Sequence, residues 1–292
     1  MYAEIASIIA PVFICAAIGF GWARSGQAFD SQLISNLVMN IGAPCLIVGT
    51  LGKVDMPAAH FSQIMMATIL VLLITAALSW LLCLLLGLSL RAFMAPLCFP
   101  NSGNMGLPLS FFAFGDEGLA VALGVFLVMS CSHFSLGLAL VSGRGSLHTV
   151  LRSPIVYAAI LAVALVYSGQ QLPGWLQSTM DLLGGLSIPL MLITLGVSLQ
   201  RLRVSDVYLS LGLAIARLLI GLAVGLLVVN LLALKGVVAA VVVLQSAMPA
   251  AVFNYLLAQR YNQQPEAVAG MVVISTVLSF VWLPFVLKLI LT

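Results

Sequence analysis

The stretch from Ala95 to Leu109 is an apolar segment interrupted by residues that break helices. Its middle contains two prolines, two glycines, two asparagines and a serine: Pro100, Asn101, Ser102, Gly103, Asn104, Gly106 and Pro108. Proline removes a backbone donor and clashes with the preceding turn, and glycine lets the chain leave helical geometry. Within a bilayer, non-helical backbone is tolerated only where protein buries it or a water-filled cavity meets it. If this segment crosses a membrane, it therefore predicts a functional site and not a simple anchor.

The composition places the chain in a membrane. Of the 292 residues, 63% are hydrophobic and 7% are charged, whereas about 25% are charged in a typical soluble domain. Because about 20 apolar residues span a bilayer, we predict an all-α polytopic protein with ten transmembrane helices in one membrane domain, residues 1–292. The ten segments are expected near 5–22, 31–51, 61–87, 92–113, 118–142, 154–169, 175–199, 207–234, 236–259 and 266–290.

The basic residues indicate how these segments are oriented. Seven arginines fall in loops on one side, and three lysines fall on the other side: Arg24, Arg91, Arg144, Arg152, Arg201, Arg203 and Arg260, against Lys53, Lys235 and Lys288. The positive-inside rule places the arginine-rich side in the cytoplasm and both termini outside. The net charge of +3 is spread along the chain, so no basic patch suggests nucleic acid. The five cysteines lie singly in apolar runs, without metal-ligand spacing, so we expect no metal and no cofactor.

The two halves of the chain resemble each other. Pro44 and Pro189 lie in the second and seventh segments, 145 residues apart, and Pro100 and Pro249 lie in the fourth and ninth, 149 residues apart. We therefore predict two repeats, approximately 1–142 and 154–292, joined by a cytoplasmic loop at 143–153. Because each repeat holds five helices, an odd number, the second enters the membrane from the opposite side. Inverted repeats with interrupted helices are typical of secondary transporters, whose sites lie near the midplane.

Three stretches of the sequence are similar to the auxin efflux carrier family, which includes plant auxin exporters and bacterial permeases for small carboxylates. They are the run from Pro100 to Leu109, the Asn40-x-x-x-Pro44 helix, and the segment from Ala247 to Asn262. The resemblance extends over the whole chain. It implies a fold related to the bile acid sodium symporters, in which broken helices four and nine cross at their prolines beside the substrate. It also implies elevator-type movement of a transport domain against a scaffold, and a homodimer.

The resemblance implies a small organic anion such as malonate, malate or lactate as the substrate. The short central loop is similar to that of the bacterial members, so we expect the bacterial inner membrane as the location. An auxin-like indole carboxylate exporter is an alternative.

A crossing of two broken helices can bind an anion without a buried lysine or arginine. Each second half-helix begins with free N–H groups and roughly half a positive charge. The candidate substrate-binding residues are those that flank the breaks, together with one residue of the second segment: Asn101, Ser102, Gly103, Asn104, Gln245, Ser246, Asn254 and Asn40. As an alternative, Asn101 and Asn104 only satisfy the broken backbone or cap the second half-helix. Pro100 and Pro249 are expected to make the breaks, and Pro44 and Pro189 either kink their helices or take part in the site.

Three ionisable residues within the predicted helices are further candidates. His133 lies at mid-depth and could carry a coupling proton, or could be a neutral ring bonded to a neighbouring carbonyl. Arg217 lies either at the cytoplasmic interface by snorkelling or inside the protein as an anion contact. Asp181 lies either near the external end of its helix or at a cation or proton site.

Other classes of protein are less well supported. The sequence contains no His-Glu-x-x-His, Gly-x-Ser-x-Gly or phosphate-loop motif, so a membrane enzyme or ATP-driven pump is not expected. An anion channel is an alternative, because broken helices also form selectivity filters, and a structural membrane protein is a third class. The ninth segment has no acidic residue before Glu266, which favours proton coupling or uncoupled transport over sodium.

Overall fold

The computed structural model describes residues 2–53, 57–143, 153–202 and 206–291. Over these ranges the chain is helical, apart from turns and one isolated bridge between two extended residues. Seven stretches in this part of the chain are long and apolar enough to cross a membrane: Ile5–Arg24, Ser31–Leu51, Ala59–Leu85, Ser102–Ser142, Gly174–Arg201, Val207–Leu231 and Pro265–Leu291. The prediction of an all-α polytopic membrane protein is therefore confirmed.

The first half of the chain begins with two long helices, one interrupted helix and one short helix. They are α1 (Tyr2–Arg24), α2 (Ser31–Leu37) with α3 (Ala43–Leu51), α4 (Ala58–Leu85) and α5 (Leu90–Cys98). Helices α2 and α3 are continuous through a π-helical turn, η1 (Val38–Gly42), and Pro44 lies in the first turn of α3.

A long helical stretch follows the first break and is itself bent. It consists of η2 (Ser102–Gly106), α6 (Leu107–Ser132), η3 (His133–Gly137) and α7 (Leu138–Ser142). Gly115 within α6 has φ 62° and ψ −150°, a backbone conformation that side chains with a Cβ rarely adopt. The bend falls between the fourth and fifth predicted segments, which we placed at 92–113 and 118–142.

The described part of the second half of the chain is also built from helices of different lengths. They are α9 (Pro154–Ser168), α10 (Gly174–Gly185), α11 (Ser187–Arg201), α12 (Val207–Leu231), α13 (Gly236–Ser246), α14 (Phe253–Arg260) and α15 (Pro265–Leu291). The central loop predicted at 143–153, with Arg144 and Arg152, and also Arg203, lie outside the described residues except for Gly143 and Ser153.

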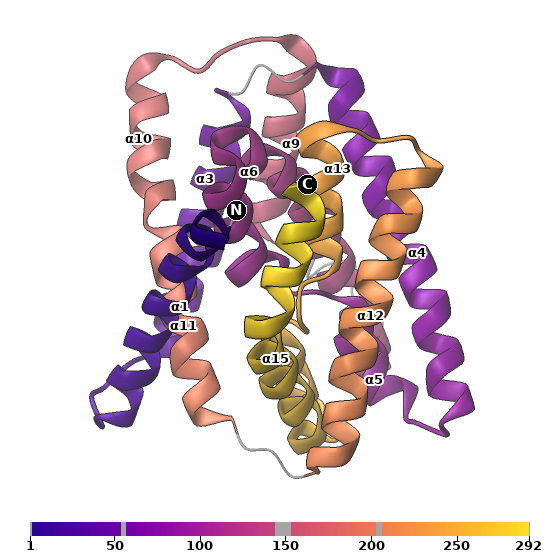
Figure 1. Cartoon of the computed structure of the whole chain (residues 1–292). Helices are drawn as coiled ribbons and strands as arrows, with labels where there is room; N and C mark the ends of the chain where they lie inside the picture. The colour runs from indigo at the N-terminus through magenta and orange to yellow at the C-terminus, as the bar shows by residue number, and fades with distance from the viewer. Residues whose placement is uncertain (1, 54–56, 144–152, 203–205, 292) are drawn as a thin grey trace.

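The turns lie at two opposite ends of the molecule (Figure 1). Those that follow α1 and α4 are at the lower end in this view, and those that follow α9 and α12 are at the upper end. Arg24 and Arg201 close α1 and α11, and Arg91 begins α5, so these arginines share one end. Lys235 precedes α13 at the other end.

Helices α1 and α11 are packed unusually closely, because each presents a glycine to the other's backbone. A Cβ on Gly196 would overlap the carbonyl of Ala16, and a Cβ on Gly19 would overlap the carbonyl of Ile193. Small residues allow such approach of helices in membrane proteins, where dispersion contacts drive association. This pair fixes the distance between the first and seventh predicted segments.

Candidate functional site

The two interrupted helices meet at their breaks in the interior of the molecule. Helix α5 ends at Cys98 and α13 ends at Ser246, just before Pro100 and Pro249. Pro100 and Ala250 form an antiparallel bridge. The Asn101 N–H donates to the Pro249 carbonyl at 2.7 Å, and the Ala251 N–H donates to the Phe99 carbonyl at 3.2 Å. Each break therefore supplies backbone partners that the other break lacks, as membrane depth requires. We use "the crossing" below for residues 99–102 and 247–252.

Arg217 of α12 lies at the crossing and is only 1% exposed. Its Nη1 donates to the Leu97 carbonyl at 3.0 Å, and its Nη2 donates to the Ser246 carbonyl at 2.9 Å. The interpretation that Arg217 snorkels to the cytoplasmic interface is therefore wrong. This interpretation was based on hydropathy. Hydropathy does not show that two carbonyls inside the protein lack helical partners and can accept hydrogen bonds from an arginine.

The second half-helix of the first break begins with polar side chains that have no protein partner. Asn101 and Ser102 are each 3% exposed, and neither Asn101 Nδ2 nor Ser102 Oγ has a hydrogen-bond partner among the described residues. Asn101 stands at the N-cap of η2, but its side chain makes no capping bond, so the capping interpretation does not describe it. Gly103 and Asn104 are partly buried. Buried polar atoms are normally paired, so these unpaired groups keep Asn101 and Ser102 as candidates for ligand contact.

The ninth predicted segment contributes Gln245 to the same region. Gln245 Nε2 donates to Ser110 Oγ at 3.2 Å, and its Oε1 has no partner in the described part of the chain. The Gln245 amide lies against Gly106, where a Cβ would overlap it. Ser246 Oγ donates to the Val242 carbonyl at 2.7 Å within its own helix, so this hydroxyl is already occupied.

His133 and Asn254 connect the fifth predicted segment to both breaks. His133 Nε2 donates to Asn254 Oδ1 at 2.8 Å, and Asn254 Nδ2 donates to the Phe99 carbonyl at 3.3 Å. The His133 ring is buried, stacks on Phe99 with centroids 4.2 Å apart, and meets Phe253 edge-on at 5.3 Å. We expected either a proton carrier or a ring bonded to a neighbouring carbonyl, and the oxygen that His133 contacts belongs to the side-chain amide of Asn254, itself a candidate site residue.

Four other candidates lie away from the crossing. Asn40 is exposed and donates to the Asn36 carbonyl of its own helix at 2.9 Å, because it faces outward from α2 and η1. Asp181 is half-exposed and pairs with Lys53 at 2.6 Å. Pro189 and Asp181 line a pocket of 390 Å³ between α3, α10, α11 and the start of α6. Pro44 lies in the neighbouring first turn of α3, and it is not among the residues that line this pocket.

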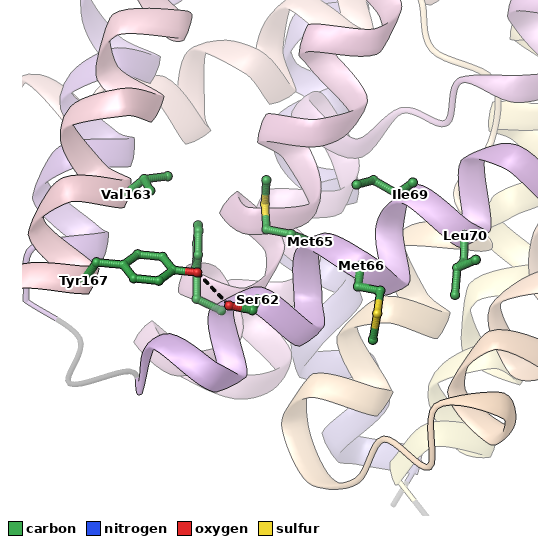
Figure 2. Close-up of a pocket in the computed structure, with 8 residues that line it drawn as sticks. Ser62, Met65, Met66, Ile69, Leu70, Val163 and Tyr167 are labelled. Atoms are coloured by element: carbon green, nitrogen blue, oxygen red, sulfur yellow. Dashed lines mark hydrogen bonds between the residues drawn. The ribbon is translucent and has the colours of Figure 1, made fainter.

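A second pocket, of 470 Å³, lies between α4 and α9. Figure 2 shows its apolar lining and the hydrogen bond between the Tyr167 and Ser62 hydroxyls, which are 2.6 Å apart. None of its lining residues belongs to the crossing. Its lining supplies no charged group, so this pocket is a poor candidate for an anion.

An all-helical membrane protein in which two interrupted helices meet has the architecture of a membrane transporter. Comparison with known proteins agrees with this class. A family model described as membrane transport protein matches residues 5–151 and 144–287. The chain therefore belongs to this family, and the resemblance to auxin efflux carriers is confirmed.

Two relatives are described as uncharacterized transporters. The protein of Methanothermobacter thermautotrophicus is 29% identical over 277 residues, which cover 87% of each chain. The protein of Methanocaldococcus jannaschii is 27% identical over 190 residues, which cover 61% of each chain. Both agree with a transport function.

Proposed function

We propose that this protein is a secondary transporter of small organic anions that binds its substrate at the crossing. The observation that carries the proposal is the pair of buried donors, Asn101 Nδ2 and Ser102 Oγ, without partners at the beginning of a half-helix. A carboxylate accepts several hydrogen bonds and is stabilised by a helix N-terminus. Malonate, malate and lactate are the representative substrates.

The charges around the crossing support an anion and not a cation. Arg217 is the one buried side chain among the described Lys, Arg, Asp and Glu residues. A sodium site would require carboxylate or carbonyl oxygens as ligands. No Asp or Glu side chain is buried among the described residues, and the Leu97 and Ser246 carbonyls already accept from Arg217. Proton coupling or uncoupled transport is therefore favoured over sodium coupling.

Contacts between equivalent positions support the proposed inverted repeats of five helices each, ten in total. A Cβ on Gly42 would overlap the Ser187 hydroxyl, and these residues are 145 residues apart, the spacing of Pro44 and Pro189. Leu97 and Ser246 are 149 residues apart, the spacing of Pro100 and Pro249, and share one arginine. In the proposed elevator movement, α1, α2, α3, α9, α10 and α11 form the scaffold, and the remaining helices move the crossing relative to it.

Counterflow in proteoliposomes tests the proposal. Labelled malonate, malate, lactate, pyruvate and indole-3-acetate are offered to liposomes with and without internal unlabelled substrate, and with and without sodium. We expect internal substrate to accelerate uptake of at least one small carboxylate, because a carrier returns faster when loaded. Steady unitary current without exchange would instead indicate the anion channel, and exchange confined to indole-3-acetate would indicate the auxin-like exporter.

We further propose that His133 carries a coupling proton. Asn254 Oδ1 can accept from Nε2–H in both the neutral and the protonated ring, so the contact persists while the charge changes. The ring's neighbours Phe99, Phe134 and Phe253 carry no charge. Added positive charge at the crossing would strengthen anion binding.

His133→Gln keeps a donor toward Asn254 and removes the titration. We expect uptake by the natural protein to increase as external pH is lowered, and the variant to show a flat profile. His60→Gln, at an exposed position of α4, is the control. An unchanged profile in His133→Gln would contradict the proton role.

The proposal places the protein as a homodimer in the cytoplasmic membrane of a prokaryote, with both termini outside. Reaction of a cysteine introduced at the C-terminus with an impermeant reagent on intact cells tests this orientation.

A further inference from the structure

We propose that Arg217 is a positioning residue with two effects at the crossing. It holds the C-terminal ends of α5 and α13 together, and it offsets the negative charge of these helix ends, so that the side of the crossing with Asn101 and Ser102 accepts an anion. This inference rests on the proposed function, because it explains how that site acquires its charge preference. It assigns to Arg217 a role at backbone carbonyls and not at the substrate.

The carbonyls that Arg217 binds are those that the breaks release. In an unbroken helix the Leu97 carbonyl would accept from the N–H of Asn101, and the Ser246 carbonyl would accept from the N–H of Ala250. The Asn101 N–H donates instead to Pro249, and the Ala250 N–H donates to Ser275 Oγ at 3.2 Å. Each carbonyl stands three residues before the proline of its break. One guanidinium therefore replaces two missing helical bonds at corresponding positions.

The fork geometry of arginine suits this task better than the ammonium of lysine. Nη1 and Nη2 lie 3.0 and 2.9 Å from the two carbonyl oxygens, so one rigid, planar group spans ends that belong to different predicted repeats. The face of α12 that carries Arg217 continues into Gly221 and Gly225. A Cβ on Gly221 would overlap the Ser246 carbonyl, so this glycine lets the end of α13 reach the arginine.

The partial charges of the four helix ends at the crossing sum to about zero, so Arg217 sets the sign of the net charge there. The C-terminal ends of α5 and α13 each carry roughly half a negative charge, and the buried guanidinium offsets both. The N-terminal ends of η2 and α14 carry roughly half a positive charge each, and no buried acidic side chain among the described residues offsets them. The net field at Asn101 and Ser102 is therefore positive, which favours an anionic ligand.

The first test measures charge at the site without a transported substrate. Ser102→Cys is introduced after the five native cysteines are replaced by alanine, and its rates of reaction with anionic sulfonatoethyl and neutral methyl methanethiosulfonate are compared in detergent. We expect Arg217→Gln to lower the anionic-to-neutral rate ratio about tenfold, because helix-end charges are worth up to ~2 kcal/mol in buried geometry. We expect Arg217→Lys to keep the ratio. The exposed Arg24→Gln is the matched control.

The second test measures whether the two ends stay together. Cys98, which is 3% exposed beside Leu97, is kept as the one cysteine and its alkylation by N-ethylmaleimide is followed by mass spectrometry. We expect alkylation to be at least about tenfold faster in both Arg217→Lys and Arg217→Gln. Each lost charged hydrogen bond weakens the contact between the ends of α5 and α13 that buries Cys98.

A fall of both methanethiosulfonate rates in parallel, or an unchanged ratio in Arg217→Gln, would overturn the charge role. Protection of Cys98 in Arg217→Lys would overturn the tethering role, and this variant decides the matter if Arg217→Gln does not fold. If the rate ratio changes as expected while no carboxylate is exchanged by the natural protein, the proposed transport function fails and the role of Arg217 stands.

Discussion

Replacement of Asn101 with alanine is expected to reduce carboxylate uptake by about tenfold or more while the protein stays folded. The Nδ2 group of Asn101 has no protein partner, so its removal breaks no internal hydrogen bond. The backbone N–H that holds Asn101 against Pro249 is unaffected. A hydrogen bond to a charged ligand contributes about 1.5–3 kcal/mol, which corresponds to roughly 10- to 150-fold in binding. Counterflow rates and thermal unfolding in detergent are the two measurements.

Asn101→Asp sharpens this prediction, because it keeps the shape and introduces a negative charge where the substrate's charge would lie. We expect no measurable uptake by this variant. Asn230→Ala is the matched control, since Asn230 is exposed and bonds only the Leu226 carbonyl of its own helix. Normal uptake by Asn101→Ala would contradict the proposed anion site at Asn101, and absence of uptake by both the natural protein and the variant would favour a structural membrane protein.

Replacement of Gly196 with valine is expected to prevent accumulation of folded protein. A side chain at this position would overlap the Ala16 carbonyl and lie against the Phe20 amide nitrogen, and backbone cannot move aside as a flexible side chain can. Overpacking typically costs about 1–3 kcal/mol and more where it displaces backbone. Expression and size-exclusion profiles in detergent measure the loss.

Gly212→Val is the control for the Gly196 variant. The same substitution is made in a long apolar helix, α12, but a Cβ on Gly212 meets no atom within 4 Å. We expect Gly212→Val to behave like the natural protein. Equal behaviour of the two variants would show that α1 and α11 do not depend on close approach.

Most of the helical course could be predicted from the sequence, because apolar length and helix-breaking residues are local properties. The break at Pro100 and the long stretch at 207–234 are examples, and α12 is observed at Val207–Leu231. The bend at Gly115 was expected only as a boundary between segments, because a single glycine within an apolar run does not reveal its φ angle.

The candidate site was less predictable, because its contacts join residues that are far apart in the chain. Asn254 and His133 were each chosen for their chemistry, yet their mutual hydrogen bond spans 121 residues. Asn40 was chosen for its place in a motif, and its exposed side chain depends on which face of α2 and η1 turns inward. The burial of Arg217 could have been predicted from the positions of the two prolines. Leu97 and Ser246 each lie three residues before a proline that breaks a helix, so both carbonyls lose their helical partners and need another donor.

The bridge between Pro100 and Ala250 has a consequence for how such proteins diversify. The two bonds that hold the breaks together join backbone groups, Asn101 N–H to Pro249 and Ala251 N–H to Phe99. Backbone bonds of this kind do not depend on the side chains at positions 101 and 102. The residues proposed to meet the substrate can therefore differ between such proteins while the junction itself persists, so one architecture can bind a different substrate after a few substitutions.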